Sequence, residues 1–210
     1  MLKIDSNKYK NIIFDLGGVI LNIDYTLTVN AFIELGINNF EGLYSKANQN
    51  PVFDNYETGK INSNEFIKEI SKQSKTPLDS ISITNAWNSM LLDLPSERLD
   101  LLEKIKSKYR IFLLSNTNEI HWISYSSYLK KTYGFEDLSN YFEKQYLSFK
   151  IGMRKPNKEI FDFVLKENAL NAEETVFIDD SIQHVQGALE RGIMGIHLTA
   201  GQTILDLFNH

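Results

Sequence analysis

The chain has 210 residues, no cysteine and a formal net charge of −5. Without cysteine there is no disulfide framework, thiolate zinc site or cysteine nucleophile, and the acidic balance argues against a nucleic-acid partner. No apolar stretch reaches the roughly 20 residues that a membrane-spanning helix needs. We expect a cytoplasmic globular protein with neither a nucleic-acid nor a membrane partner, either a monomer or a homodimer.

Three short, unbroken apolar runs predict strands that are buried on both faces of a parallel sheet. They cover residues 12–14, 111–114 and 176–178, and residues 195–198 form a less distinct fourth. Small or acidic polar residues follow each of the first three runs. Because ligands of open α/β sheets bind at the carboxyl ends of the strands, these three ends predict one shared site.

A long segment without strand character separates the first two predicted strands and is too long for one crossover helix. Helix signals predict four helices in it, at residues 26–35, 39–49 (ending before Pro51), 62–72 (capped by Asn62 or Ser63) and 80–92. We predict a helical domain over residues 24–93, inserted into an α/β core domain made of residues 1–23 and 94–210.

Carboxylates at two of the strand ends predict a metal site. Asp15 follows the first strand and precedes Gly17 and Gly18, which allow a tight turn and close approach of a ligand. Asp179 and Asp180 follow the third strand. Together with Asp15 they could hold Mg²⁺ through carboxylate oxygens.

Donors of positive charge and of hydrogen bonds occur at corresponding places. Ser115 and Asn116 end the second strand, where a hydroxyl and an amide can bind an anion. Lys155, followed by Pro156 at a helix start, can bind a phosphate or steady a nucleophilic carboxylate. Taken singly, each of these residues has a plainer interpretation as a turn, a helix cap or a surface lysine. Their conjunction at strand ends favours a functional site.

Four ordered motifs resemble those of the haloacid dehalogenase superfamily. They are residues 14–20 (FDLGGVI), 113–116 (LLSN), 155–156 (KP) and 178–181 (IDDS). Three further stretches are similar to a bacterial subgroup that contains the α-glucose-1-phosphate phosphatases: residues 114–118 with His121, residues 152–156 with Ile160 and Phe161, and residues 56–61 with Glu65 and Phe66. The resemblance spans nearly the whole chain.

The resemblance implies an α/β fold with a Rossmann-like core, a parallel sheet flanked by helices and an inserted helical cap of four-helix type. It also implies a Mg²⁺-dependent phosphatase of small phosphorylated metabolites, with sugar 1-phosphates as candidate substrates. Asp15 would form an aspartyl-phosphate that water hydrolyses. The implied metal ligands are Asp15, Gly17, Asp180 and Asp179, and the implied phosphate- or substrate-binding residues are Ser115, Asn116, Lys155 and His121.

Two positions leave alternatives open. His121 either faces the site or packs in the helix that follows Asn116. Gly17 stands where most phosphatases of the superfamily carry a second Asp, the general acid and base, whose help is worth ~10²–10⁴-fold. Asp24, His121 or a cap residue could replace this acid. Without a replacement, we expect a preference for esters with acidic leaving groups, such as anomeric sugar phosphates or aryl phosphates.

Two other functions compete with the phosphatase. A metal-free dehalogenase-type hydrolase also uses an Asp nucleophile, but the adjacent Asp179 and Asp180 favour metal and phosphate. A non-catalytic phosphate-binding regulator would bind a ligand and release no phosphate, because Gly17 lacks an acid. A phosphomutase is disfavoured for the same reason. Four aromatic or polar residues of the helical segment are candidates to face the phosphate: Tyr44, Asn48, Phe53 and Tyr56.

Overall fold

A five-stranded parallel sheet forms the centre of the computed structural model, which describes residues 4–44 and 51–208. The strand order is β3-β2-β1-β4-β5. The strands are β1 (Asn11–Phe14), β2 (Arg110–Ser115), β3 (Lys144–Leu147), β4 (Thr175–Asp179) and β5 (Met194–His197). The predicted α/β class with a parallel sheet is therefore confirmed.

The strand β3 is the one that the apolar runs did not predict. It lies at the edge of the sheet and pairs only with β2. Its sequence KQYL is exposed at the first residue and buried only at the last two. Because an edge strand need not be covered on both faces, it lacks the unbroken apolar run that marks β1, β2 and β4.

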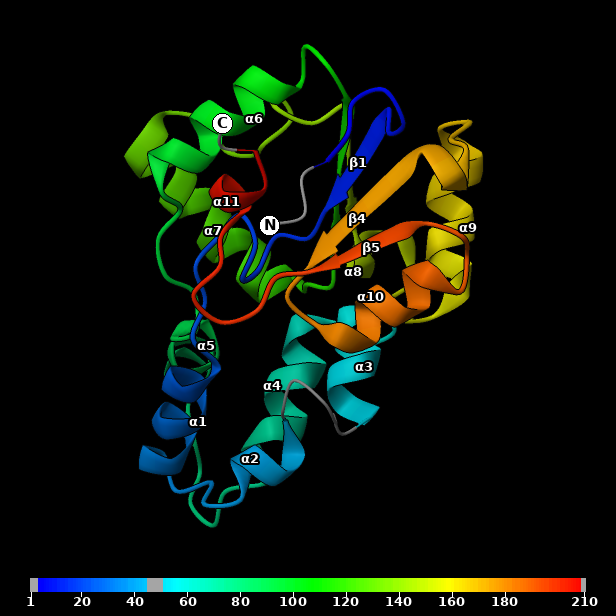
Figure 1. Ribbon diagram of the computed structural model, residues 1–210. Helices are drawn as coiled ribbons and strands as arrows, with labels where there is room; N and C mark the ends of the chain where they lie inside the picture. Colours follow the sequence, from blue (N-terminus) through cyan, green and yellow to red (C-terminus); the bar gives the residue numbers. More distant parts are fainter. Residues whose placement is uncertain (1–3, 45–50, 209–210) are drawn as a thin grey trace.

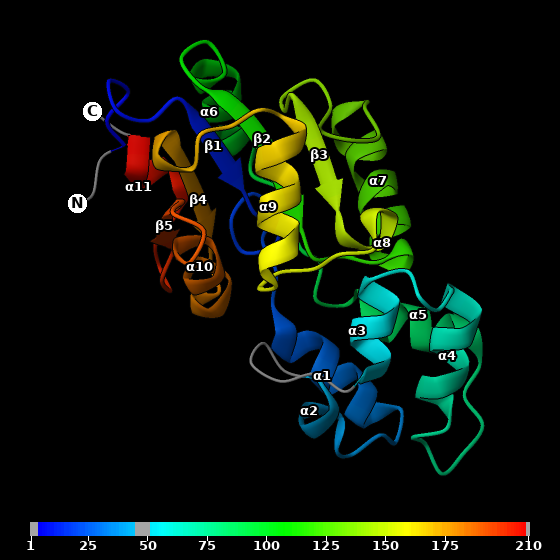
Figure 2. The ribbon, with the colours of Figure 1, turned by 90° about the vertical axis from the view of Figure 1, so that its right-hand side faces the viewer.

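Helices cover both faces of the sheet (Figures 1 and 2). On one side lie α6 (Ser96–Ile105), α7 (Glu119–Tyr133) and α11 (Ile204–Phe208); on the other lie α9 (Lys158–Glu167) and α10 (Ile182–Leu189). The short α8 (Ser148–Ile151) follows β3, and a 3₁₀ turn, Ala172–Glu174, precedes β4.

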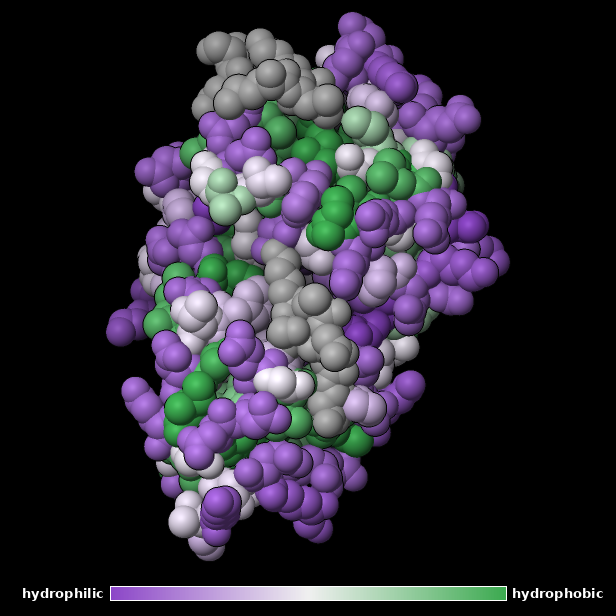
Figure 3. All heavy atoms as spheres, turned by 60° about the horizontal axis from the view of Figure 1, so that its bottom comes forward, coloured by the Kyte–Doolittle hydropathy of each residue, from purple (hydrophilic) through white to green (hydrophobic). Residues whose placement is uncertain are grey.

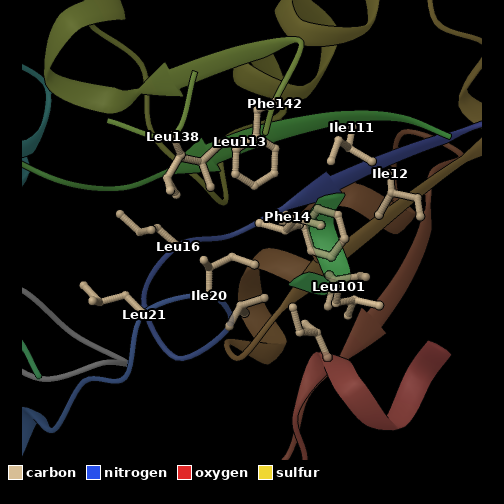
Figure 4. Packing of buried hydrophobic residues seen from close by; sticks show 14 of the residues in the cluster. Ile12, Phe14, Leu16, Ile20, Leu21, Leu101, Ile111, Leu113, Leu138 and Phe142 are labelled. Carbon is tan, nitrogen blue, oxygen red and sulfur yellow. The ribbon is translucent and has the colours of Figure 1, made fainter. Parts of the chain in front are cut away.

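Alternation along the strands explains why both faces are apolar. Ile12 and Phe14 of β1 point into the cluster that contains Leu101 of α6 (Figure 4). Ile13, between them, belongs to the opposite cluster with Phe161 of α9. Successive side chains of a strand point to opposite faces, so an unbroken run of three apolar residues contributes to both cores.

The helices inserted between β1 and β2 gather beyond the carboxyl ends of the strands (Figures 1 and 2). They are α1 (Tyr25–Glu34), α2 (Phe40–Leu43), α3 (Pro51–Glu57), α4 (Ser63–Ser71) and α5 (Ser80–Asn88). They share a hydrophobic core of their own, in which Trp87 contacts the rings of Phe53 and Phe66. We refer to α1–α5 as the helical cap, and its extent as a domain, residues 24–93, stays a prediction.

The cap differs from the predicted four helices at Pro51. The helix expected over residues 39–49 ends at Leu43, and positions 45–49 of that prediction, including Asn48, lie outside the described residues. Pro51 begins α3 instead of only terminating the helix before it. Proline suits the first turn of a helix, because its ring fixes φ and its missing N–H has no partner there. At α4 the expected cap is confirmed: Asn62 and Glu65 form a capping box.

The surface agrees with the composition. Hydrophilic residues dominate the face that Figure 3 shows, and apolar residues lie between them in small groups. Among residues 4–44 and 51–208, no helix is long and apolar enough to cross a membrane.

Candidate active site

Three carboxylates meet at the carboxyl end of the central strands. Asp15 directly follows β1, Asp179 ends β4, and Asp180 comes next. The two strands are neighbours in register, and the Asp15 backbone N–H donates to the Ile178 carbonyl at 2.9 Å. Carboxylate oxygens of the three aspartates consequently lie within 4.8 Å of one another. The structure thus brings the polar ends of these two predicted strands together.

Lys155 bridges two of these carboxylates from the loop between α8 and α9. Its Nζ lies 2.8 Å from Asp15 Oδ1 and 2.7 Å from Asp179 Oδ2, and its side chain is 0% exposed. Asn116, after β2, fixes this loop: its Oδ1 accepts from the Lys155 backbone N–H, and its Nδ2 donates to the Lys155 carbonyl, both at 2.9 Å. The Asn116 side chain therefore positions the lysine.

Burial and crowding set the charge of the nucleophile candidate. Burial, together with the carboxylates of Asp179 and Asp180, raises the pKa of Asp15 to about 8, although Lys155 opposes the rise. Burial would raise the pKa of Asp179 as well, but Lys155 and His184 lower it to about 2. The two carboxylates in turn hold the pKa of Lys155 above its ordinary value despite burial. Lys155 thus keeps Asp179 ionised, but its charge does not offset the effect of burial on the pKa of Asp15.

This donor set fits Mg²⁺. Three carboxylates against one ammonium leave an excess of two negative charges when all are ionised, which a divalent cation would balance. Mg²⁺ prefers oxygen ligands and is usually held by one or two carboxylates. Asp179 is already occupied by Lys155, by the Ser181 backbone N–H at 2.7 Å and by His184 Nδ1 at 3.1 Å. Asp15 and Asp180, which both line the cavity described below, are therefore better placed to hold the ion.

His184 is a site residue that the sequence reasoning missed. It lies in the first turn of α10, five residues after Asp179, and its Nδ1 is 3.1 Å from both Asp179 oxygens. Burial lowers the pKa of His184, although Asp179 opposes this. The signal was present in the sequence, because a helix that starts directly after a strand returns its first turn toward the end of that strand.

Of the two glycines that follow Asp15, Gly18 must be glycine because the Asp180 carboxylate approaches it too closely for a side chain. Its φ is +73°, and a Cβ there would lie 2.3 Å from Asp180 Oδ2. Any other residue would push the Asp180 carboxylate away and strain the backbone. A Cβ at Gly17 would instead meet Ile23 Cδ1 at 3.0 Å.

A cavity of about 280 Å³ lies between the strand ends and the cap. The predicted site residues Asp15, Gly17, Ser115, Asn116, His121 and Asp180 all line it. The cap contributes polar groups to the opposite wall, namely Tyr25, Tyr44, Asp54 and Glu57. Of the other cap candidates, Phe53 and Tyr56 are buried in the cap core.

An ion-pair cluster joins the two walls. Arg154, next to Lys155, pairs with Asp54, and its Nη2 lies 3.0 Å from Glu57 Oε2. Both acids belong to α3. The cavity wall opposite the strand ends therefore carries fixed charges of both signs together with tyrosine hydroxyls.

His121 lines the cavity but is fixed by a hydrogen-bond network. Asn118 Oδ1 faces two unambiguous donors, the His121 backbone N–H at 3.0 Å and Trp87 Nε1 at 3.3 Å. This fixes the amide, so Asn118 Nδ2 must donate to His121 Nδ1 at 3.1 Å. The proton of the neutral ring is then on Nε2, which donates to the Trp87 carbonyl at 3.0 Å. The ring also stacks on Trp87, with 4.7 Å between centroids.

This network predicts a pH dependence of stability. Burial lowers the pKa of His121 to about 4. Below pH ~6.5 His121 takes up a proton in the unfolded chain but stays neutral in the folded chain. The contribution of His121 to the free energy of unfolding is therefore lost as pH falls from about 6.5 to about 4. Between pH 7 and pH 5, the free energy of unfolding of the wild type should fall by about 2 kcal/mol more than that of His121→Gln, measured by urea denaturation. Parallel pH curves for the two proteins would contradict a neutral buried ring.

Comparison with known proteins identifies the family of this fold and site. The model of the haloacid dehalogenase-like hydrolases matches residues 9–192. The chain therefore belongs to the haloacid dehalogenase-like hydrolases.

Two similar proteins have described activities. A D-ribitol-5-phosphate phosphatase from Bacteroides thetaiotaomicron is 33% identical over 185 residues, which cover 87% of this chain and 88% of the relative. A sesquiterpene phosphatase from Aspergillus oryzae is 27% identical over 194 residues, 91% of this chain and 90% of the relative.

Two solved structures are similar to this chain in both fold and sequence. A haloacid dehalogenase family enzyme from Bacteroides thetaiotaomicron, crystallised with magnesium and inorganic phosphate, has a TM-score of 0.82 and 37% identity, covering 96% of this chain and 100% of its own. A hydrolase of the same family from Porphyromonas gingivalis has a TM-score of 0.82 and 28% identity, covering 93% of each chain.

Proposed function

We propose that this chain is a Mg²⁺-dependent phosphatase of small, polyhydroxylated phosphate esters of the polyol-phosphate and sugar-phosphate kind. The observation that carries the proposal is the buried Asp15–Lys155–Asp179 bridge beside Asp180, which opens into a cavity with a polar far wall. The relatives bear out the broader prediction of a phosphoric monoester hydrolase that uses magnesium.

In the mechanism that we propose, Asp15 is the nucleophile. Its carboxylate attacks phosphorus, and water then hydrolyses the aspartyl-phosphate. Lys155, 2.8 Å away, orients Asp15 and offers charge to the phosphoryl oxygens. Ser115 and the backbone N–H of Asn116 are the proposed further donors to those oxygens. When bound, Mg²⁺ would be held by Asp15, Asp180 and the Gly17 carbonyl, and would supply the positive charge that this carboxylate-rich site lacks.

The far wall supports the substrate class. Tyr25 and Tyr44 offer hydroxyls, and Asp54, Glu57 and Arg154 offer charged hydrogen-bonding groups. Hydroxyls of a polyol can add hydrogen bonds to this polar wall, whereas an isoprenoid chain would displace water from it and offer no hydrogen bond in return. The wall therefore favours the substrate type of the ribitol-phosphate relative over that of the sesquiterpene relative. The α-glucose-1-phosphate subgroup stays a prediction.

A panel of three esters tests the substrate class. We expect kcat/KM for D-ribitol 5-phosphate or α-glucose 1-phosphate to exceed that for farnesyl phosphate by about 10²-fold or more. Faster turnover of farnesyl phosphate would overturn the proposed class. Within the panel, ribitol 5-phosphate is the ester of a poorly acidic primary alcohol. Comparable rates on it and on glucose 1-phosphate would contradict the preference for acidic leaving groups that Gly17 suggested.

The competing functions predict different results in the same assay. A metal-free dehalogenase would leave all three phosphates intact and would not need the cluster of three carboxylates. A non-catalytic regulator would bind phosphate and Mg²⁺ but release no phosphate from any ester.

A further inference from the structure

The first turn of α7 is packed into the cap, although the rest of this helix covers the sheet. Ile120, the second residue of α7, is buried in the hydrophobic core that the cap helices share. The next residue, His121, stacks its ring on Trp87 of α5 and donates from Nε2 to the Trp87 carbonyl at 3.0 Å. The cap and the start of α7 therefore form one buried joint.

A chain of hydrogen bonds from Tyr56 of α3 completes this joint. The backbone N–H groups in the first turn of a helix have no acceptor within the helix. At Ile120 the cap supplies the acceptor, because the Tyr56 hydroxyl accepts from the Ile120 N–H at 3.0 Å. The same hydroxyl lies 2.9 Å from Ser63 Oγ, which is also bonded to the Glu119 carboxylate. A carboxylate can only accept, so Ser63 donates to Glu119 and Tyr56 donates to Ser63.

The joint is continuous with the proposed phosphate donors. Residues 115–118 connect the end of β2 to α7 and contain both of these donors. Thr117 is held from the core: its backbone N–H donates to Ser148 Oγ, and its carbonyl accepts from the same hydroxyl, both at 2.9 Å. Asn118, the N-cap of α7, is held from the cap, because its Oδ1 accepts from Trp87 Nε1 at 3.3 Å. Core and cap thus each fix one residue of this short connection.

We propose that Tyr56 and Trp87 are positioning residues, through which the cap holds residues 115–118 in the geometry that binds the phosphoryl group. This inference rests on the function proposed above. Hydrogen bonds weaken steeply as their geometry worsens, so a shift of the first turn of α7 would weaken the bonds from Ser115 and Asn116 to phosphate. Neither Tyr56 nor Trp87 is among the described residues that line the cavity. They therefore act through the backbone of residues 115–118.

Tyr56→Phe removes the hydroxyl and keeps the ring, and the binding of inorganic phosphate to the Mg²⁺-loaded protein measures its effect. We expect the dissociation constant of phosphate to rise by about 10-fold, because a buried N–H loses its acceptor and the turn shifts. The dissociation constant of Mg²⁺ should stay unchanged, because Asp15 and Asp180 follow β1 and β4 and lie outside residues 115–118. Isothermal titration calorimetry measures both constants.

Tyr128→Phe is the matched control. The Tyr128 hydroxyl also accepts from a backbone N–H, that of Leu94 at 3.1 Å, and Tyr128 belongs to the same helix, α7. Its loss should lower the free energy of unfolding as Tyr56→Phe does, but should leave the phosphate affinity at the wild-type value. Trp87→Phe removes the Nε1 donor and keeps an aromatic ring, and it should weaken phosphate binding in the same direction as Tyr56→Phe.

The outcomes separate this inference from the function on which it rests. Unchanged phosphate affinity in Tyr56→Phe, or an equal weakening in Tyr128→Phe, would overturn the positioning role alone. If Tyr56→Phe does not fold, the phosphate affinity of Trp87→Phe decides in the same way. A wild-type protein that binds Mg²⁺ but neither binds inorganic phosphate nor releases it from D-ribitol 5-phosphate would overturn the proposed function itself.

Discussion

Asp15→Asn is expected to reduce phosphate release by at least ~10⁴-fold, because it removes the attacking oxygen and leaves the rest of the site in place. The substitution is isosteric, and asparagine can still accept a hydrogen bond from Lys155, which lies 2.8 Å from Asp15 Oδ1. Release from p-nitrophenyl phosphate by wild type and variant, at saturating Mg²⁺, measures the effect. Retention of more than a tenth of the wild-type kcat would contradict a nucleophilic Asp15.

The free energy of unfolding of the same variant shows whether activity is lost through removal of the nucleophile or through unfolding. The pKa of Asp15 is raised in the folded protein, so at neutral pH its carboxyl group destabilises the metal-free fold. The sign follows from linkage: the folded chain holds a proton that the unfolded chain releases above pH ~4, and stability falls as pH rises from there toward 8. Asp15→Asn should therefore be more stable than the wild type in EDTA at pH 7, by about 1–3 kcal/mol.

Lys155→Met should cost about 3–5 kcal/mol of unfolding free energy in EDTA, because it leaves the buried, ionised Asp179 carboxylate without its cation. Lys155 is fully buried, and both Asp15 and Asp179 accept hydrogen bonds from its Nζ. Phosphate release should be lost as well, since the same ammonium orients the nucleophile. Urea denaturation at pH 7 measures the stability change.

Two further variants show whether the cost arises from unpaired charge. Adding Asp179→Asn to Lys155→Met removes the stranded carboxylate and should recover part of the loss. Lys10→Met breaks an ion pair with Glu174 in which the lysine side chain is 62% exposed, and should cost less than about 1 kcal/mol. A loss at Lys155 no larger than that at Lys10 would contradict the buried bridge.

Much of the core could be predicted because its signals are local. Strands β1, β2 and β4 are buried on both faces, so each contains an unbroken apolar run. The polar residue that follows each run lies at the site. The edge strand β3 carries no such run, since only its last two residues are buried. In the cap, Pro51 was interpreted as an end signal, although the same residue suits the start of α3.

The roles of individual site residues depended on contacts that no pattern encodes. The Asn116 side chain holds the backbone of Lys155, a contact that the sequence did not indicate, whereas substrate binding by Asn116 stays a prediction. Nothing in the sequence places Trp87 against His121, because they come from the cap and the core, 34 residues apart.

Phosphate release by the wild-type protein from D-ribitol 5-phosphate and p-nitrophenyl phosphate, with Mg²⁺ and then with excess EDTA, tests the central claim most directly. The carboxylate cluster of Asp15, Asp179 and Asp180 predicts release that requires Mg²⁺ and returns when the ion is restored. Release that is unchanged in EDTA, or no release from either ester by protein that binds Mg²⁺, would contradict a magnesium-dependent phosphatase.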